Sequence, residues 1–184
     1  RINEFLNFES EIVEGIETKH EIEGTIEFKN VTFVYENTGI KALSNVSFKL
    51  NKGETLAILG KTGSGKSTIA LLIARSLEPT SGEILIDGKN IHDLSVESIR
   101  NEIGYVPQEA FLFSDSLTNN ILFGSDETTE LIAEKFAKKA VVHENIDKFK
   151  ERYETVVGER GVTLSGGQKQ RVSIARALVN DPNI

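Results

Sequence analysis

The sequence predicts an α/β fold with a parallel sheet at its core, and three patterns support that prediction. Thr55–Leu59 is a short, continuous, largely apolar run that ends at a glycine, as is typical of a strand buried on both faces. The segment that follows, Ile69–Ala74, is almost wholly apolar and predicts a buried helix. Strand-like and helix-like segments then alternate along the chain, which is the order expected when helices connect parallel strands.

The other elements follow from local periodicity. Thr25–Tyr35 alternates apolar and polar residues with one phase slip at Lys29 and Asn30, which predicts a strand with a β-bulge. From about residue 117 to 149 the pattern is helical, and a last helix is predicted from about Ser165 to Val179. Further strands are predicted at 46–50, at 83–86 before an Asp-Gly turn, and at 103–106 before Pro107. The apolar stripe of the helical region comprises Ile132, Ala133, Phe136, Ala137, Ala140 and Val141.

The composition excludes several classes of function. The 184 residues contain no cysteine, so the chain has no cysteine-ligated metal site, thiol nucleophile or redox role. Residues 1–30 carry five of the seven excess negative charges, and no basic stripe indicates a nucleic-acid partner. No apolar run is long enough to span a bilayer and no signal-peptide pattern is present, so we expect a soluble, intracellular chain. Because it lacks methionine and starts at Arg1, we also expect a piece of a longer polypeptide.

A phosphate-binding loop is predicted at Gly60–Ser67, which matches the pattern G-x-x-x-x-G-K-[ST] between a strand and a helix. Its glycines let backbone N–H groups close around phosphate oxygens. Lys66 would place a cation on the β- and γ-phosphates, and Ser67 would offer its hydroxyl to Mg²⁺. The predicted nucleotide contacts are Gly60, Lys61, Thr62, Gly63, Ser64, Gly65, Lys66, Ser67 and Thr68.

A second anion site is predicted at the start of the last helix. Ser165 and Gln168 have the spacing of a capping box, and the two glycines between them leave backbone N–H groups open. One chain therefore carries two separate helix starts suited to phosphate. The residues of this motif are Leu164, Ser165, Gly166, Gly167 and Gln168.

With both motifs in place, the sequence resembles the nucleotide-binding domain of ATP-binding-cassette (ABC) transporters from about Ile22 onward. Gly60–Ser67 is similar to the family's Walker A motif and Leu164–Gln168 to its signature motif. The resemblance implies a P-loop NTPase of ABC type, with a parallel-sheet core, an antiparallel β subdomain and a helical signature subdomain at about 110–165. It further implies that Tyr35 stacks on adenine and that Gln108 contacts Mg²⁺ and the attacking water.

Two further segments resemble the exporter-type members of the family. Val157–Gly161 is similar to the loop that contacts the intracellular helices of the transmembrane domains through Glu159 and Arg160. Phe111–Ile121 is similar to the exporter segment that follows the glutamine loop. The resemblance then implies that residues 1–24 link the last membrane helix to the ATPase domain at residues 25–184, and that the Gln108 loop also faces the membrane domains.

The family resemblance implies a mechanism in which two such domains pair head to tail, as a homodimer or a heterodimer. ATP on Lys66 of one copy would be covered by Ser165 and Gly167 of the other, and hydrolysis would open the pair. The intact protein would thus use ATP and Mg²⁺ to drive export, at the cytoplasmic face of the cell membrane. The transported substrate does not follow from these residues.

In the family, the Walker B aspartate and the glutamate that acts as general base lie beyond the position of Ile184. Of the catalytic residues only Lys66 and Gln108 can be assigned, so we expect the 184-residue chain to bind nucleotide but to hydrolyse it poorly. We also expect Thr55–Leu59 to lack strand neighbours, leaving a marginal and aggregation-prone chain. Two alternatives stay open: a soluble ABC protein acting in translation or DNA maintenance, and a non-catalytic nucleotide-binding module.

Overall fold

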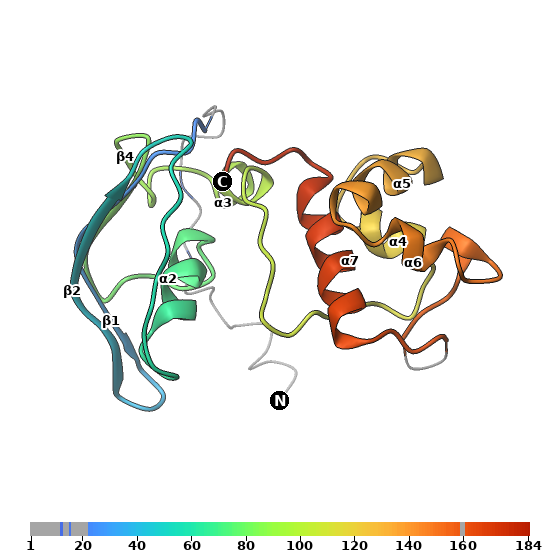
Figure 1. Ribbon diagram of the computed structural model, residues 1–184. Coiled ribbons are helices and arrows are strands. Elements are labelled where there is room, and N and C mark those ends of the chain that lie inside the picture. The colour runs from blue at the N-terminus through green and yellow to red at the C-terminus, as the bar shows by residue number, and fades with distance from the viewer. Residues whose placement is uncertain (1–11, 13–14, 16–21, 159–160) are drawn as a thin grey trace, which may run out of the picture. The chain divides into compact units, whose positions relative to one another are not determined.

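The computed structural model describes residues 12, 15, 22–158 and 161–184, which form two compact units (Figure 1). The first unit extends to Asn101 and includes Asn183, and the second comprises Glu102–Pro182 and Ile184. The segment from about 110 to 165 lies in the second unit, together with the last helix. Most of the expected tail at 1–24 lies outside the described residues. No helix in the described ranges has the length and apolarity needed to cross a bilayer.

The first unit is built on an antiparallel sheet with the strand order β2-β1-β3-β4. β1 (Ile26–Tyr35) pairs with β2 (Ile40–Leu50) on one side and with β3 (Ser81–Ile86) on the other, and the short β4 (Lys89–Asn90) extends β3. The predicted bulge is confirmed, because the β1 register shifts after Phe28 and Asn30 has a φ of 50°. The antiparallel β region that the resemblance implied is therefore present.

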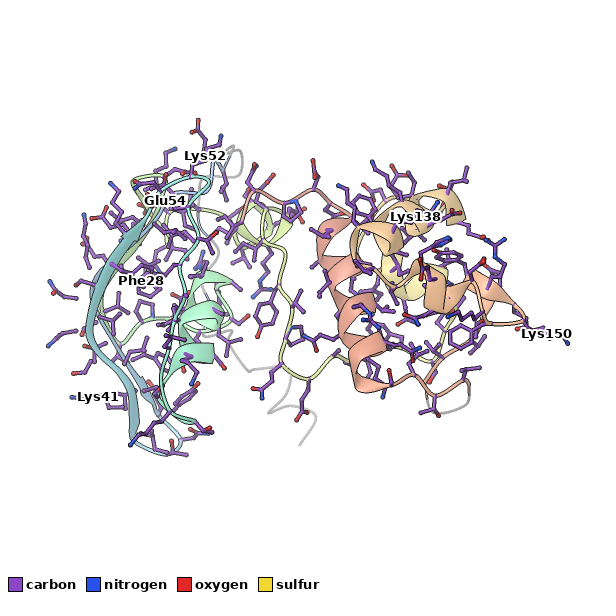
Figure 2. All side chains as sticks on the ribbon, viewed as in Figure 1. Phe28, Lys41, Lys52, Glu54, Lys138 and Lys150 are labelled. Atoms are coloured by element: carbon purple, nitrogen blue, oxygen red, sulfur yellow. The ribbon has the colours of Figure 1, made fainter. Side chains whose placement is uncertain are left out.

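Alternate residues of β1 supply the core of the first unit. Ile26 and Phe28 before the bulge, and Val31 and Phe33 after it, are buried, in keeping with the side-chain period of a strand on each side of the bulge. The ring of Phe28 stacks on that of Phe48 at 4.5 Å, whereas Lys41 and Lys52 extend outward (Figure 2). The unit also contains the helices α2 (Lys66–Ile73) and α3 (Val96–Asn101).

The second unit is helical and has its own apolar core. Its elements are α4 (Leu117–Leu122), α5 (Glu130–Lys139), α6 (His143–Ile146), a 3₁₀ turn (Arg152–Glu154) and α7 (Gly166–Leu178). α7 packs against both α4 and α5. The buried residues that hold these helices together include Leu117, Ile121, Ala133, Phe136, Ala137, Tyr153, Val172 and Ala175.

The prediction that Val141 belongs to the apolar stripe of the helical region is wrong. α5 ends at Lys139 with Ala140 as its C-cap, and Val141 has a φ of 56° and is 76 % exposed. The left-handed backbone at Val141 turns the chain, so that Val142 and not Val141 enters the core.

The predicted parallel core is not formed in the described part of the chain. Thr55–Leu59 and Ile103–Val106 are not strands, and Leu59 is 92 % exposed. A strand of this kind depends on ladder hydrogen bonds and burial supplied by neighbours on both edges. The described residues place no such neighbours beside Thr55–Leu59, which therefore runs as an extended segment without strand pairing.

Ile184 nevertheless makes the two hydrogen bonds of a parallel ladder within the second unit. Its N–H donates to the carbonyl of Glu102 at 2.9 Å, and its carbonyl accepts from the N–H of Gly104 at 2.8 Å. In a parallel pair, a residue of one strand forms hydrogen bonds with the two residues on either side of its neighbour in the other strand. Here the neighbour of Ile184 is Ile103, between Glu102 and Gly104. The backbone around Ile103 is therefore disposed to accept a parallel neighbour.

The exposure of Leu59 generates a stability prediction for the 184-residue chain. Leu59→Lys is expected to change the free energy of unfolding by less than about 0.5 kcal/mol, because the side chain is already in solvent. The matched control Leu72→Ala removes a buried side chain and is expected to cost about 2–5 kcal/mol. Urea denaturation measures both. A loss for Leu59→Lys as large as that for Leu72→Ala would show that the segment is paired in solution.

Candidate functional site

The loop before α2 adopts a backbone that only glycine accommodates at its end. Gly65 is the residue before the helix and has a φ of 83°, in the left-handed region. A Cβ atom added there would lie 2.4 Å from the carbonyl oxygen of Ala42. A Cβ at Gly60 would lie 2.5 Å from the hydroxyl of Ser64. The loop is therefore closely packed upon itself and against β2, as a phosphate-binding loop must be to present backbone N–H groups.

Lys66 begins α2 and folds back over this loop. Its ammonium donates hydrogen bonds to the carbonyls of Gly60 at 2.9 Å and Lys61 at 2.8 Å. These bonds are solvent-exposed, and a charged phosphate oxygen is a stronger acceptor than a carbonyl. The cation is thus held at the loop where an anion can take over its hydrogen bonds, and the residues present fit a phosphate group. Ser67 follows as an exposed residue in the first turn of the helix.

Tyr35 lies at the end of β1 and contacts the same helix. Its hydroxyl is hydrogen-bonded to that of the buried Thr68 at 3.1 Å, and its ring meets Phe33 edge-on at 4.8 Å. The structure therefore brings Tyr35, Thr68 and the loop together in one unit. The cavity that Tyr35 borders is formed with residues 76–80 and not with the loop. Stacking of Tyr35 on adenine stays a prediction.

The second predicted site is a capped helix start in the helical unit. Ser165 precedes α7, and its hydroxyl accepts from the N–H of Gln168 at 3.3 Å. Gln168 returns the contact, because its side-chain oxygen accepts from the N–H of Ser165 at 2.8 Å. The capping box is therefore confirmed. Leu164 is buried in the core and anchors the motif, which leaves the N–H groups of Gly166 and Gly167 in a first turn that offers them no helical acceptor.

Packing among the described residues does not explain the two glycines of this motif. A Cβ atom added at Gly166 or Gly167 would have no heavy atom within 4 Å among the described residues. At Gly158, by contrast, an added Cβ would lie 2.7 Å from the hydroxyl of Ser114. Glycine early in a helix also costs stability relative to alanine. The open space above α7 is therefore suited to the close approach of a group from outside the chain.

The Gln108 loop is attached to α7. Gln108 is exposed on a bend, and the carbonyl of the preceding Pro107 accepts from the side chain of Gln170 at 3.2 Å. Both lie in the second unit, so the structure links the glutamine loop to the helix that begins at Ser165. Gln170 could not be identified from the sequence, because a polar residue in a helix gives no sign of a partner 63 residues away.

The two exporter-like segments also lie together. The N–H of Val157 donates to the carbonyl of Asp115 at 3.0 Å, and Gly158 has a φ of 101° where it passes Ser114. Glu159 and Arg160, which the sequence analysis singled out, lie outside the described residues.

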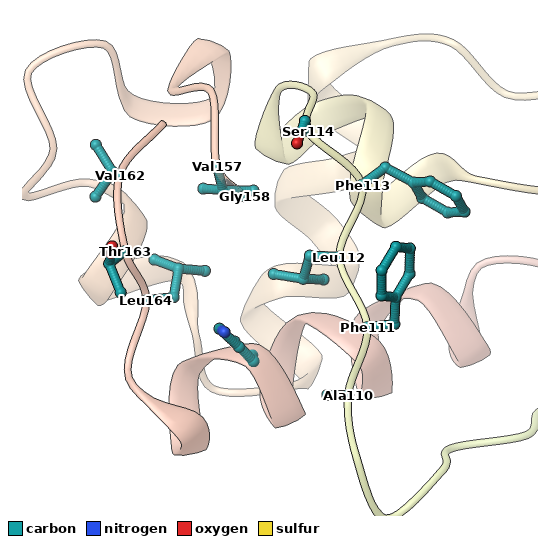
Figure 3. Close-up of a pocket in the computed structure, with 11 residues that line it drawn as sticks. Ala110, Phe111, Leu112, Phe113, Ser114, Val157, Gly158, Val162, Thr163 and Leu164 are labelled. Atoms are coloured by element: carbon teal, nitrogen blue, oxygen red, sulfur yellow. The ribbon is translucent and has the colours of Figure 1, made fainter. Parts of the chain in front are cut away.

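Between these segments and α7 lies a cavity of about 530 Å³ (Figure 3). Its apolar walls come from Leu112, Val157, Val162 and Leu164, and Lys169 of α7 also borders it.

The two predicted Mg²⁺ contacts belong to different units. Ser67 belongs to the first unit and Gln108 to the second. The residues that the structure describes contain no group of three or more His, Cys, Asp or Glu side chains arranged to hold a metal ion. A role of Ser67 and Gln108 in metal binding therefore stays a prediction.

Comparison with known proteins gives consistent matches. A family model described as "ABC transporter" matches residues 43–184. The uncharacterized ABC transporter ATP-binding protein YfiB of Bacillus subtilis is 48 % identical over all 184 residues, and these cover 32 % of its length. The putative multidrug export ATP-binding/permease protein YgaD of the same organism is 52 % identical over 163 residues, which are 88 % of this chain and 28 % of that protein.

A solved structure agrees with these relatives. The structure of a bacterial Atm1-family ABC exporter with ATP bound matches 97 % of this chain with a TM-score of 0.90 and 38 % identity, and the match covers 32 % of that exporter chain. The chain thus spans 28 % to 32 % of the length of these three proteins.

The open glycines of α7 generate a second stability prediction. Gly167→Ala is expected to leave the chain as stable as before or to stabilise it by up to about 1 kcal/mol, because alanine favours the helix and meets no atom. Gly158→Ala is the control and is expected to destabilise by about 1–3 kcal/mol, because it combines overpacking with a positive φ. Urea denaturation of both variants compares them. Equal losses would mean that the chain itself requires Gly167.

Proposed function

The chain belongs to the ABC transporter family, and on that basis we propose that it is the nucleotide-binding part of an exporter whose intact form hydrolyses ATP to move a substrate across a membrane. The observation that carries this proposal is the pair of open helix starts, one at the loop before α2 and one at Ser165. Each offers unpaired N–H groups and the positive end of a helix dipole to an anion. The relatives named as export proteins support the transport role over that of a soluble ABC protein.

In the proposed site, the residues of the first unit hold the nucleotide. The backbone N–H groups of Gly60–Gly65 would surround the phosphates, and Lys66 would exchange its bonds to the loop carbonyls for bonds to phosphate oxygens. Tyr35 would contact adenine. Ser67 and Gln108 would hold Mg²⁺, which when bound neutralises charge on the phosphates. Gln108 would also orient the attacking water.

The second unit would act on the nucleotide of a partner domain. The capping box fixes Ser165, and the space above Gly166 and Gly167 admits a phosphate to the open N–H groups. We therefore propose a head-to-tail pair in which Leu164–Gln168 of one copy covers the ATP bound to Lys66 of the other. The pair closes on ATP and opens after hydrolysis, because the charge between its faces changes.

Transmembrane domains are the second proposed partner. The Gln108 loop and the loop at 157–161, with Glu159 and Arg160, would face them. Both loops are attached to the second unit, through Gln170 and through Asp115. Movement of these loops would therefore act on the unit that carries the signature motif, at the cytoplasmic face of the membrane.

Nucleotide binding by the chain is expected to depend on the cation of Lys66. Lys66→Met removes the charge that phosphate would meet and should weaken binding of an ATP analogue at least tenfold. Lys61→Met is the control, because Lys61 contributes only its carbonyl to the contact and should change the affinity less than twofold. Isothermal titration calorimetry measures both. Equal affinities for the two variants would contradict the assignment of the loop.

Head-to-tail pairing predicts complementation between two inactive copies of the intact protein. A Lys66→Met copy and a Gly167→Asp copy, mixed in one dimer, regenerate one site in which both contributing motifs are native. ATP turnover of the mixed dimer should reach about half that of the native dimer, while dimers carrying the same substitution on both copies stay inactive. Phosphate release from differently tagged, co-purified copies measures this. An inactive mixed dimer would argue that both motifs act on the same chain's nucleotide.

A further inference from the structure

A buried amide organises the chain segment that precedes α4. Asn120 lies in α4 and has no exposed surface. Its side-chain oxygen accepts from the N–H of Phe113 at 2.8 Å, and its NH₂ group donates to the carbonyls of Phe113, Asp115 and Ser116 at 3.0, 3.3 and 3.0 Å. The side chain of Asn120 is thus hydrogen-bonded to backbone groups of three residues in the turn at 113–116. The conformation of residues 113–116 is therefore set by Asn120.

Arg176, in the last turn of α7, clamps the same segment from the other side. Its Nε donates to the carbonyl of Asn120 at 2.7 Å, and one terminal nitrogen donates to the side-chain oxygen of Asn120 at 3.1 Å. The other terminal nitrogen donates to the carbonyl of Phe111 at 3.1 Å. The planar fork of arginine makes all three bonds at once, which the single ammonium of lysine cannot reproduce.

The charge of Arg176 is compensated without a carboxylate. No Asp or Glu among the residues described here forms a salt bridge with it, and its Cζ lies 5.6 and 5.7 Å from the ring centroids of Phe113 and Phe123. Those rings stack at 4.3 Å and are 37 % and 56 % exposed. Burial lowers the pKa of Arg176, although an arginine still carries its charge.

A partly buried Arg176 costs more free energy than a residue that serves packing alone would need to. A partly buried cation must be desolvated, and an apolar residue would fill the same space without that cost. The contact with Phe113 and Phe123 does not offset this cost by burying apolar surface, because both rings stay partly exposed. What the fork supplies is geometric: it holds one chain segment in a single register on α7.

The clamped segment is continuous with the loops that adjoin the signature helix. It follows the Gln108 loop, whose Pro107 is bonded to Gln170 in the first half of α7, and it ends beside Asp115, which accepts from Val157. α7 is therefore joined to this stretch at two points, Gln170 toward its start and Arg176 at its end. Displacement of the stretch would act on the helix that Ser165 begins.

We propose that Arg176 and Asn120 are positioning residues for ATP turnover, which hold residues 111–116 in register on α7 and so orient Ser165–Gly167 for a partner's nucleotide. This inference rests on the proposed function. Both residues belong to the second unit, whereas the Walker A loop belongs to the first, so we expect ATP binding to one copy not to depend on them. ATP turnover does depend on Arg176 and Asn120, because it requires that the signature motif of the opposite copy be correctly oriented.

The test measures kcat, KM for ATP, ATP bound per chain at saturation, and Tm in the intact protein. Arg176→Lys should lower kcat at least tenfold, while KM and the ATP stoichiometry stay within twofold. Asn120→Asp should act in the same direction, because a carboxylate keeps the contact with Arg176 but cannot donate to three carbonyls. The matched control is Arg171→Lys on the same helix, which loses one 3.3 Å bond to Asn145 and should leave kcat within twofold.

The proposal is overturned if kcat of Arg176→Lys or of Asn120→Asp stays within twofold, or falls only in proportion to ATP stoichiometry, since a purely structural role would lower both together. If Arg176→Lys does not accumulate as folded protein, Asn120→Asp, which conserves volume, decides the question. Failure of the proposed function gives a different result: the native protein would not hydrolyse ATP, or Gly167→Asp would leave its turnover unchanged.

Discussion

Both candidate phosphate sites depend on the same constraint, which is that an anion reaches backbone N–H groups only where no side chain stands in the way. At Gly65 the chain enforces this itself, because a larger residue would collide with Ala42. At Gly166 and Gly167 none of the residues that the structure describes enforces it, because an added Cβ would meet no heavy atom within 4 Å. The first motif is therefore explained by the fold of its own unit, whereas packing among the described residues leaves the glycines of the second unexplained.

The features that could be predicted from sequence are those set by near neighbours in the chain. The capping box spans four residues, Ser165–Gln168, and the bulge at Asn30 is visible as a phase slip in an alternating strand. The parallel core could not be predicted in the same way, because Thr55–Leu59 forms a strand only when neighbours pair with it. Its apolar run reports a preference for burial, and the described residues do not supply that burial.

The same distinction holds within the candidate sites. Lys66 and Ser165 belong to contiguous motifs whose spacing is fixed by the start of a helix. Arg176 and Asn120 are 56 positions apart, and an arginine followed by apolar residues gives no sign that its partners are backbone carbonyls. The prediction that Val141 belongs to the apolar stripe was wrong for a related reason, since helical periodicity cannot show where a residue with left-handed backbone will end the helix. Contacts of this kind become visible only once the helices are packed.

The hydrogen bonds of Lys66 also bear on how tightly the loop can hold a nucleotide. The ammonium of Lys66 donates to two carbonyls of the loop and so neutralises part of their negative charge. Binding is then an exchange of acceptors rather than the gain of new ones, so part of the attraction between lysine and phosphate is offset by the bonds that are lost. In return, little conformational entropy is lost on binding, because the loop is already ordered. The lysine would thus limit the affinity of the loop for a phosphate group while preorganising the loop to receive one.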